Sequence, residues 1–144
     1  MTQENKELLL RDLCTRLPYG VRIAYRYNYI LELRAVLKIG MVLGANVITD
    51  ECITTSIENV IPYLFPLSSM TEEQKYDFYC HFIENDCDFG DFKEFYFENN
   101  EWHKMLTSID DCECVIDWFN KNHFDYRCLI PKGLAIDATN LNIY

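Results

Sequence analysis

The chain has 144 residues, of which 49% are hydrophobic, 15% aromatic and 25% charged, and its formal net charge at pH 7 is -10. This composition excludes a disordered tail and a fibrous repeat, and no apolar run reaches the ~18–20 residues that a membrane-spanning helix needs. Nonspecific binding to nucleic acids depends on cationic side chains that displace counterions, so the strong negative charge argues against that function too.

The first predicted element is a helix over residues 4–17, where leucines recur at helical spacing and acidic residues precede basic ones, as the helix dipole favours. After this helix, apolar and polar residues alternate in two runs, 21–28 and 31–39. The alternation predicts an antiparallel hairpin with one apolar and one polar face. It places Leu37 on the apolar face and Val36 on the polar face.

Shorter apolar or β-branched runs follow at residues 41–48, 52–57 and 58–65. An isolated hairpin is only marginally stable in water, so we expect these runs to join the hairpin. Together they predict a small antiparallel β-sheet or an SH3-like barrel of four or five short strands. With the first helix, this sheet or barrel makes up the predicted N-terminal part, residues 1–66.

The segment around Pro62 and Pro66 marks a change in the sequence. Proline restricts its own φ and the conformation of the residue before it, so this segment is predicted to be an extended connector. Beyond it, apolar residues return to helical spacing, and Thr71 with Gln74 forms a capping box. We therefore predict an α+β fold in which residues 67–144 form an acidic region of about three helices, packed with the N-terminal part into one compact unit.

Charge divides the chain at the same place. Residues 1–66 carry seven basic and seven acidic side chains, whereas residues 67–144 carry six basic and sixteen acidic ones. An acidic face of this kind attracts a basic protein surface at long range. Ten Tyr, nine Phe and two Trp exceed the needs of one small core, so we expect some of them at the surface, where Tyr and Trp anchor interfaces. The same excess is compatible with a homodimer.

Two groups of residues are candidate binding sites. Tyrosines near the hairpin tip lie beside arginines in the sequence, a combination that suits binding of a small ligand or a nucleotide. The alternative interpretation is that these tyrosines only pack against side chains of the neighbouring strand. The candidate ligand site comprises Arg22, Tyr25, Arg26, Tyr27, Tyr29 and Arg34. The candidate surface for a basic protein partner comprises Trp102, Asp110, Asp111, Glu113 and Asp117.

The sequence lacks the Walker A, GxGxxG, GxSxG and HExxH motifs, so no catalytic residue is predicted. Cysteines and a histidine lie close together between residues 112 and 128, but their spacing does not match a zinc knuckle, and we predict reduced thiols, no metal and no cofactor. The acidic residues at 110–117 leave a metal-dependent hydrolase as a third alternative. The N-terminus has none of the features of a signal peptide, which favours a cytoplasmic protein without membrane association.

Three strings of the sequence resemble a family of short uncharacterised proteins from gut Bacteroidetes and their phages. They are Leu17-Pro-Tyr-Gly-Val21, Pro62-Tyr-Leu-Phe-Pro-Leu-Ser-Ser-Met-Thr-Glu-Glu73, and Asp117-Trp-Phe-Asn-Lys-Asn-His-Phe-Asp-Tyr-Arg127 with its continuation to Ala135. Cys128 and Pro131 stand where that family has a glycine and an acidic residue. The resemblance implies a bacterial cytoplasm or a phage-infected cell, and it implies no activity, cofactor or site.

These observations favour a non-enzymatic protein-binding module whose partner has a basic surface. With the resemblance, they suggest a phage- or prophage-encoded modulator of a host protein. A small-ligand or nucleotide-binding protein that uses the basic and aromatic hairpin is the alternative hypothesis.

Overall fold

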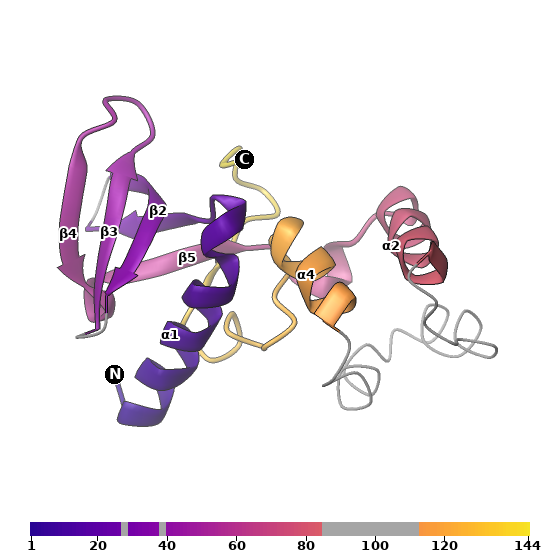
Figure 1. The fold of residues 1–144 in the computed structure, drawn as a ribbon, viewed down its shortest axis with the longest axis horizontal. Helices are drawn as coiled ribbons and strands as arrows, with labels where there is room; N and C mark the ends of the chain where they lie inside the picture. Colours follow the sequence, from indigo (N-terminus) through magenta and orange to yellow (C-terminus); the bar gives the residue numbers. More distant parts are fainter. Residues whose placement is uncertain (27–28, 38–39, 85–112) are drawn as a thin grey trace.

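The computed structural model describes residues 1–26, 29–37, 40–84 and 113–144 (Figure 1). Its helices and strands, in chain order, are α1 (Gln3–Arg16), β1 (Arg22–Tyr25), β2 (Tyr29–Leu37), β3 (Met41–Asn46), β4 (Cys52–Ser56), β5 (Val60–Leu64), α2 (Glu72–Glu84), α4 (Glu113–Lys121) and β6 (Ile136–Asp137). An N-terminal helix, a sheet and later helices confirm the predicted α+β class. Figure 1 shows the strands at one end of the molecule, α2 at the other, and α1 and α4 between them.

Within the described residues, six strands form one open sheet in the order β4-β3-β2-β1-β5-β6. Neighbouring strands are antiparallel except for β5 and β6, which are parallel. β4 and β6 lie at opposite ends of this order and do not pair with each other. Of the two predicted architectures, the described strands therefore form the open sheet and not the barrel. The parallel pair requires the chain to travel from β5 through the helical region before it returns as β6.

Pro62 lies inside β5, opposite Ile23 of β1, which confirms the strand predicted within residues 58–65 and places the start of the predicted extended connector after Leu64 instead of at Pro62. The strand alternates in burial, with Val60 and Leu64 fully buried. A proline is tolerated in a strand where no ladder hydrogen bond depends on its missing N–H, which is the situation at a sheet edge. β6 pairs with the two residues of β5 that follow Pro62, so at the proline itself β1 is the described neighbour.

A bulge in β2 changes which side chains face the core. The register of β2 against β3 shifts between Leu33 and Ala35, so Arg34 is the extra residue. Because side chains alternate between the faces of a strand, one extra residue exchanges the faces beyond it. Val36 therefore packs against the core and Leu37 is 41% exposed, the reverse of the simple alternation predicted from the sequence.

Two apolar clusters hold the described residues together. The first joins α1, the sheet and the segment after α4; it comprises Leu9, Leu13, Val21, Ile23, Leu31, Leu33, Val42, Ile57, Val60, Leu64, Leu129, Leu134 and Ala135. The second is mainly aromatic and joins α2, α4 and the residues after α4; it comprises Met70, Phe78, Val115, Trp118, Phe119, Phe124 and Tyr126. Much of the aromatic excess is thus used in a second core, while Tyr29 and Tyr76 are 50% and 68% exposed.

A local sequence signal fixes the start of α2. The Gln74 backbone N–H donates to Thr71 Oγ1 at 3.2 Å, and the Thr71 N–H donates to Gln74 Oε1 at 2.9 Å. The two bonds satisfy amides that have no partner inside the helix. This geometry confirms the capping box predicted from the sequence.

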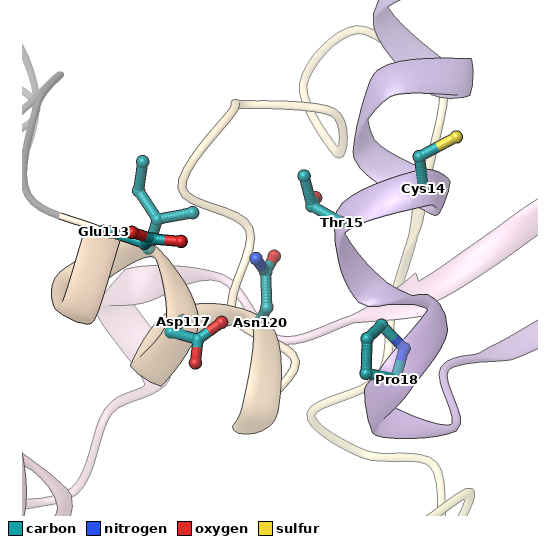
Figure 2. A pocket seen from close by; sticks show the side chains of 7 residues that line it. Cys14, Thr15, Pro18, Glu113, Asp117 and Asn120 are labelled. Atoms are coloured by element: carbon teal, nitrogen blue, oxygen red, sulfur yellow. The ribbon is translucent and has the colours of Figure 1, made fainter.

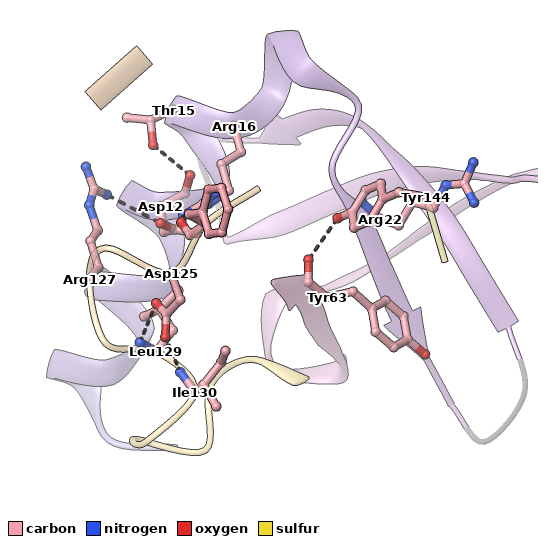
Figure 3. Close-up of polar contacts among 11 residues, drawn as sticks. Asp12, Thr15, Arg16, Arg22, Tyr63, Asp125, Arg127, Leu129, Ile130 and Tyr144 are labelled. Atoms are coloured by element: carbon pink, nitrogen blue, oxygen red, sulfur yellow. Dashed lines mark hydrogen bonds and ion pairs between the residues drawn. The ribbon is translucent and has the colours of Figure 1, made fainter. Parts of the chain in front are cut away.

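Buried charges link α1 to the segment after α4 (Figure 3). Asp12 and Arg16 have no side-chain exposure, and Arg16 Nε donates to Asp12 Oδ2 at 2.7 Å. Arg16 Nη2 donates to the Phe124 carbonyl at 2.7 Å, and Arg127 Nη1 lies 4.0 Å from Asp12 Oδ1. Asp125 accepts from the next turn's backbone amides, so the chain after α4 is held by polar contacts as well as by apolar packing.

Cys128 offers a simple test of this C-terminal geometry. Its φ is 55°, in the left-handed region that costs a non-glycine residue about 1–2 kcal/mol, and its side chain is exposed. We expect Cys128→Gly to raise the free energy of unfolding by up to about 1 kcal/mol, since glycine removes this strain but adds entropy to the unfolded chain. Urea denaturation measures the change. The control Cys14→Gly, at an exposed position inside α1, should lower stability by about 1 kcal/mol; destabilisation by Cys128→Gly would contradict the expected strain.

Candidate functional site

A groove of about 540 Å³ lies between α1 and α4 (Figure 2). Its lining residues are Cys14, Thr15, Pro18, Glu113, Ile116, Asp117 and Asn120. Figure 2 shows the side chains of Glu113, Asp117 and Asn120 on α4 and those of Thr15 and Pro18 across from them on α1 and the turn that follows it. Among these lining residues there are two carboxylates and no basic side chain.

The sequence of α4 explains why the carboxylates face the groove. Val115, Trp118 and Phe119 are buried in the aromatic core, which fixes the orientation of the helix. Glu113 and Asp117 are four residues apart and so project from the same side of the helix, away from that core. Both are exposed. Glu113 is also in the first turn, where the helix dipole stabilises a negative charge.

Asp117 lies near the Tyr19 hydroxyl, and the two residues line the same hollow. Hydrogen bonding of its hydroxyl toward Asp117, followed by burial and the negative charge of Asp117, raises the pKa of Tyr19 to about 12. Tyr19 follows α1 in a short 3-10 turn, Leu17–Tyr19, that ends at Gly20 with a φ of 65°. The tyrosine hydroxyl therefore stays protonated at neutral pH.

Asn120 is the most unusual residue of the groove. Its exposed fraction is 2%, and its Oδ1 has no hydrogen-bond partner in the described part of the chain. A buried amide oxygen without a partner costs about 1–3 kcal/mol, so such atoms are rare and call for an explanation. In Figure 2 the carboxamide extends from α4 into the space between the two helices, toward Thr15.

A second, smaller hollow of about 350 Å³ lies on the other side of Asp117. It is lined by Tyr19, Asp77, Cys80, His81, Asp117, Trp118, Lys121 and Asn122. Asp77 accepts a hydrogen bond from Trp118 Nε1 at 3.0 Å, which ties α2 to α4. Lys121 gives this hollow a basic residue, whereas the α1–α4 groove has acidic and neutral lining only.

The structure brings together two residues of the predicted partner surface. Glu113 and Asp117 both line the α1–α4 groove. The other three, Trp102, Asp110 and Asp111, lie outside the described residues. Asn120 and Thr15 were not predicted as site residues, because nothing in the sequence shows that α1 packs beside α4. The one available signal was the polar Asn120 among the apolar residues of α4.

The structure separates the predicted ligand site into three places. Arg26 lies over the Tyr25 ring at 5.0 Å, and the Tyr25 and Tyr29 rings are 6.5 Å apart, so these three form a cluster at the hairpin tip. Arg22 instead donates to the Ile143 carbonyl and lies over the Tyr144 ring. Arg34 pairs with Glu32 at 3.2 Å and Asp50 at 3.8 Å. Tyr27 lies outside the described residues.

Neither a metal centre nor a membrane span is found in the part of the chain that the structure describes. No group of three or more His, Cys, Asp or Glu side chains is arranged there to hold a metal ion. No helix there is long and apolar enough to cross a bilayer.

In comparisons with known proteins, no family model, no curated protein and no solved structure matches this chain. The chemistry of the groove is therefore the basis for assigning a function.

Proposed function

We propose that the protein is a non-enzymatic binding module that docks a protein partner with a basic surface through the α1–α4 groove and the acidic face of α4. The observation that carries the proposal is the lining of the groove, where Glu113, Asp117 and the unpartnered Asn120 oxygen meet without a neighbouring cation in the lining. Carboxylates and an unpartnered amide oxygen, with no cation among the lining residues, suit a positively charged group.

The distribution of charge supports the same proposal. Residues 67–144 carry ten more acidic than basic side chains. Among the described residues, the ion pairs do not join a carboxylate of this half to a cation of the first half; the contact that joins the halves is Arg127 with Asp12. The described carboxylates of residues 67–144 are thus not neutralised by cations of the first half, and they would attract a basic partner at long range.

The proposal is tested by removing the two groove carboxylates in the double variant Glu113→Gln/Asp117→Asn. Immobilised protein is incubated with a bacterial lysate at low and at high salt, and retained proteins are identified by mass spectrometry. We expect basic proteins to be retained at low salt, released by salt because screening weakens exposed charge pairs, and reduced at least severalfold by the double variant.

The matched control, Glu51→Gln/Glu73→Gln, removes the same charge at exposed positions that line neither hollow. It should retain the same proteins as the unmodified chain. Equal losses in both double variants, retention that is indifferent to salt, or recovery of no basic protein would each refute docking through the groove.

The biological setting follows from the sequence resemblance and forms part of the proposal. A protein of phage or prophage origin that binds a host protein fits a small, acidic module with no catalytic motif in its sequence. Recovery of the same basic protein from a Bacteroidetes lysate and not from an unrelated one would support this setting.

A further inference from the structure

Hydrogen-bond acceptors converge on the α1–α4 groove from both of its walls. Glu113 and Asp117 supply carboxylates, and Asn120 supplies the amide oxygen. The Thr15 hydroxyl donates its hydrogen to the Asp12 carbonyl at 2.8 Å, so toward the groove it can act as an acceptor. A ligand group that fits this lining must be rich in donors and positively charged.

The buried amide of Asn120 shows that the groove is more than an acidic patch. Its oxygen lacks a donor among the described residues although the side chain is 98% buried, as its 2% exposed fraction implies. An apolar residue at this position would avoid the cost of an unsatisfied buried oxygen. A donor from a ligand in the groove would satisfy it.

The groove also has apolar lining next to its acceptors. Ile116 lies one turn before Asn120 on α4, and Pro18 faces the groove from the 3-10 turn that follows α1. Long cationic side chains bury their methylene groups on apolar surface while the charged end reaches polar groups. The arrangement of Pro18 and Ile116 beside the carboxylates suits such a side chain.

We propose that the α1–α4 groove binds an arginine side chain presented by the protein partner. This inference rests on the proposed function and names the group that enters the groove. The guanidinium is planar and offers five donors, so it can bond a carboxylate and the Asn120 oxygen together, and it is less strongly hydrated than the lysine ammonium. Arginine is therefore expected to bind more tightly than lysine.

The test uses a small probe in place of the partner. 15N-labelled protein is titrated with Nα-acetyl-L-arginine methylamide, with its lysine analogue, and with its citrulline analogue, which has a similar shape but no charge. We expect dissociation constants on the order of millimolar for arginine, weaker binding of lysine, and no saturable binding of citrulline. The shifts should be largest at Thr15, Ile116 and Asn120.

Four variants of the chain make the test specific. Asp117→Asn should weaken arginine binding by about fivefold, because it removes one partly screened charge. Asn120→Leu should weaken arginine binding and leave the melting temperature unchanged or higher. If Asn120 served only to stabilise the fold, its replacement would instead lower the melting temperature. Arg11→Gln removes an exposed cation one helical turn before Thr15 and should tighten binding. Glu51→Gln, the matched control, should change nothing.

The outcomes separate this inference from the proposed function. Binding of arginine and citrulline with equal affinity, shifts that lie away from the groove, or unchanged binding by Asp117→Asn would overturn the arginine site. If basic proteins are still captured through Glu113 and Asp117 in that case, the proposed function stands without it. If the probe binds as expected but no basic protein is captured, the arginine-binding groove is supported and the docking function is refuted.

Discussion

Replacing Asp12 with alanine is expected to lower the free energy of unfolding by about 3–5 kcal/mol, because it leaves the Arg16 guanidinium buried without its counter-charge. Both side chains are inaccessible to solvent, and the Nε–Oδ2 distance is 2.7 Å. Arg16 cannot escape to water without losing its bond to the Phe124 carbonyl. The effect should be visible as a lower urea midpoint, followed by the fluorescence of the buried Trp118.

Two comparisons show whether the loss comes from an uncompensated buried charge. The double variant Asp12→Leu/Arg16→Met removes both charges and should recover much of the stability, since apolar residues often replace a buried ion pair at little cost. Glu58→Ala breaks the pair with Lys6 at 3.3 Å, whose side chains are 33% and 50% exposed, and should cost no more than about 1 kcal/mol. If Asp12→Ala were as mild as Glu58→Ala, burial would not be what makes the Asp12–Arg16 pair important.

The second large effect is a loss of stability on mild acidification that depends on His123. Its ring stacks on Tyr144 with centroids 4.0 Å apart, and Nδ1 is buried without a hydrogen-bond partner in the described chain. Burial, followed by the positive charges of Arg16 and Arg22, lowers the pKa of His123 from 6.5 to about 4. Protonation would place a cation beside two others, at an atom with no acceptor.

The lowered pKa sets the sign and the pH range. Between pH about 6.5 and about 4 the unfolded chain binds a proton at His123 and the folded chain does not, so acidification favours unfolding. The contribution to stability is fully present above pH 6.5 and is lost as the pH falls toward 4, by about 3 kcal/mol over the whole range. Burial raises the pKa of Asp125, which contributes in the opposite direction.

The contribution of His123 is isolated by His123→Asn, because asparagine tolerates the φ of 58° at this position and does not titrate. Urea denaturation of both proteins between pH 7 and pH 4 should give a shallower loss of stability for the variant, so that the stability of the variant relative to the unmodified chain rises by up to about 3 kcal/mol as the pH falls. Groups other than His123, including Asp125, contribute to both curves and cancel in the difference. Parallel curves would show that His123 has an ordinary pKa in the folded protein.

Local signals in the sequence predicted many elements well. The spacing of apolar residues in α1 and the strand alternation from β1 to β5 need only the pattern of neighbouring residues. The capping box at Thr71 and Gln74 was correct to the atom, since both of its hydrogen bonds join residues three positions apart. Glu113 and Asp117 were predicted to belong to one partner surface, and their spacing of four residues places both on one side of α4.

The features that the sequence pattern did not predict depend on how separate segments pair or pack. Whether Pro62 can occupy a strand depends on which residues pair beside it, and β6 comes from the far end of the chain. The bulge at Arg34 depends on the register in which β2 pairs with β3, which the alternation within β2 alone does not show. An Asp–Arg pair four residues apart is usual on a helix surface, and only the packing of the C-terminal segment over α1 makes the Asp12–Arg16 pair a buried one.

The sequence by itself determined the helix and strand periods, the charge asymmetry and the acidic edge of α4, because each of these is a property of residues close together in the chain. Only the tertiary structure decided that α1 lies beside α4, that the buried Asn120 oxygen has no donor among the described residues, and that Thr15 and Pro18 face the carboxylates. The physical reason is that the two walls of the groove, α1 and α4, are about 100 residues apart in the sequence. They come together only because folding buries the apolar side chains of both helices in the two cores.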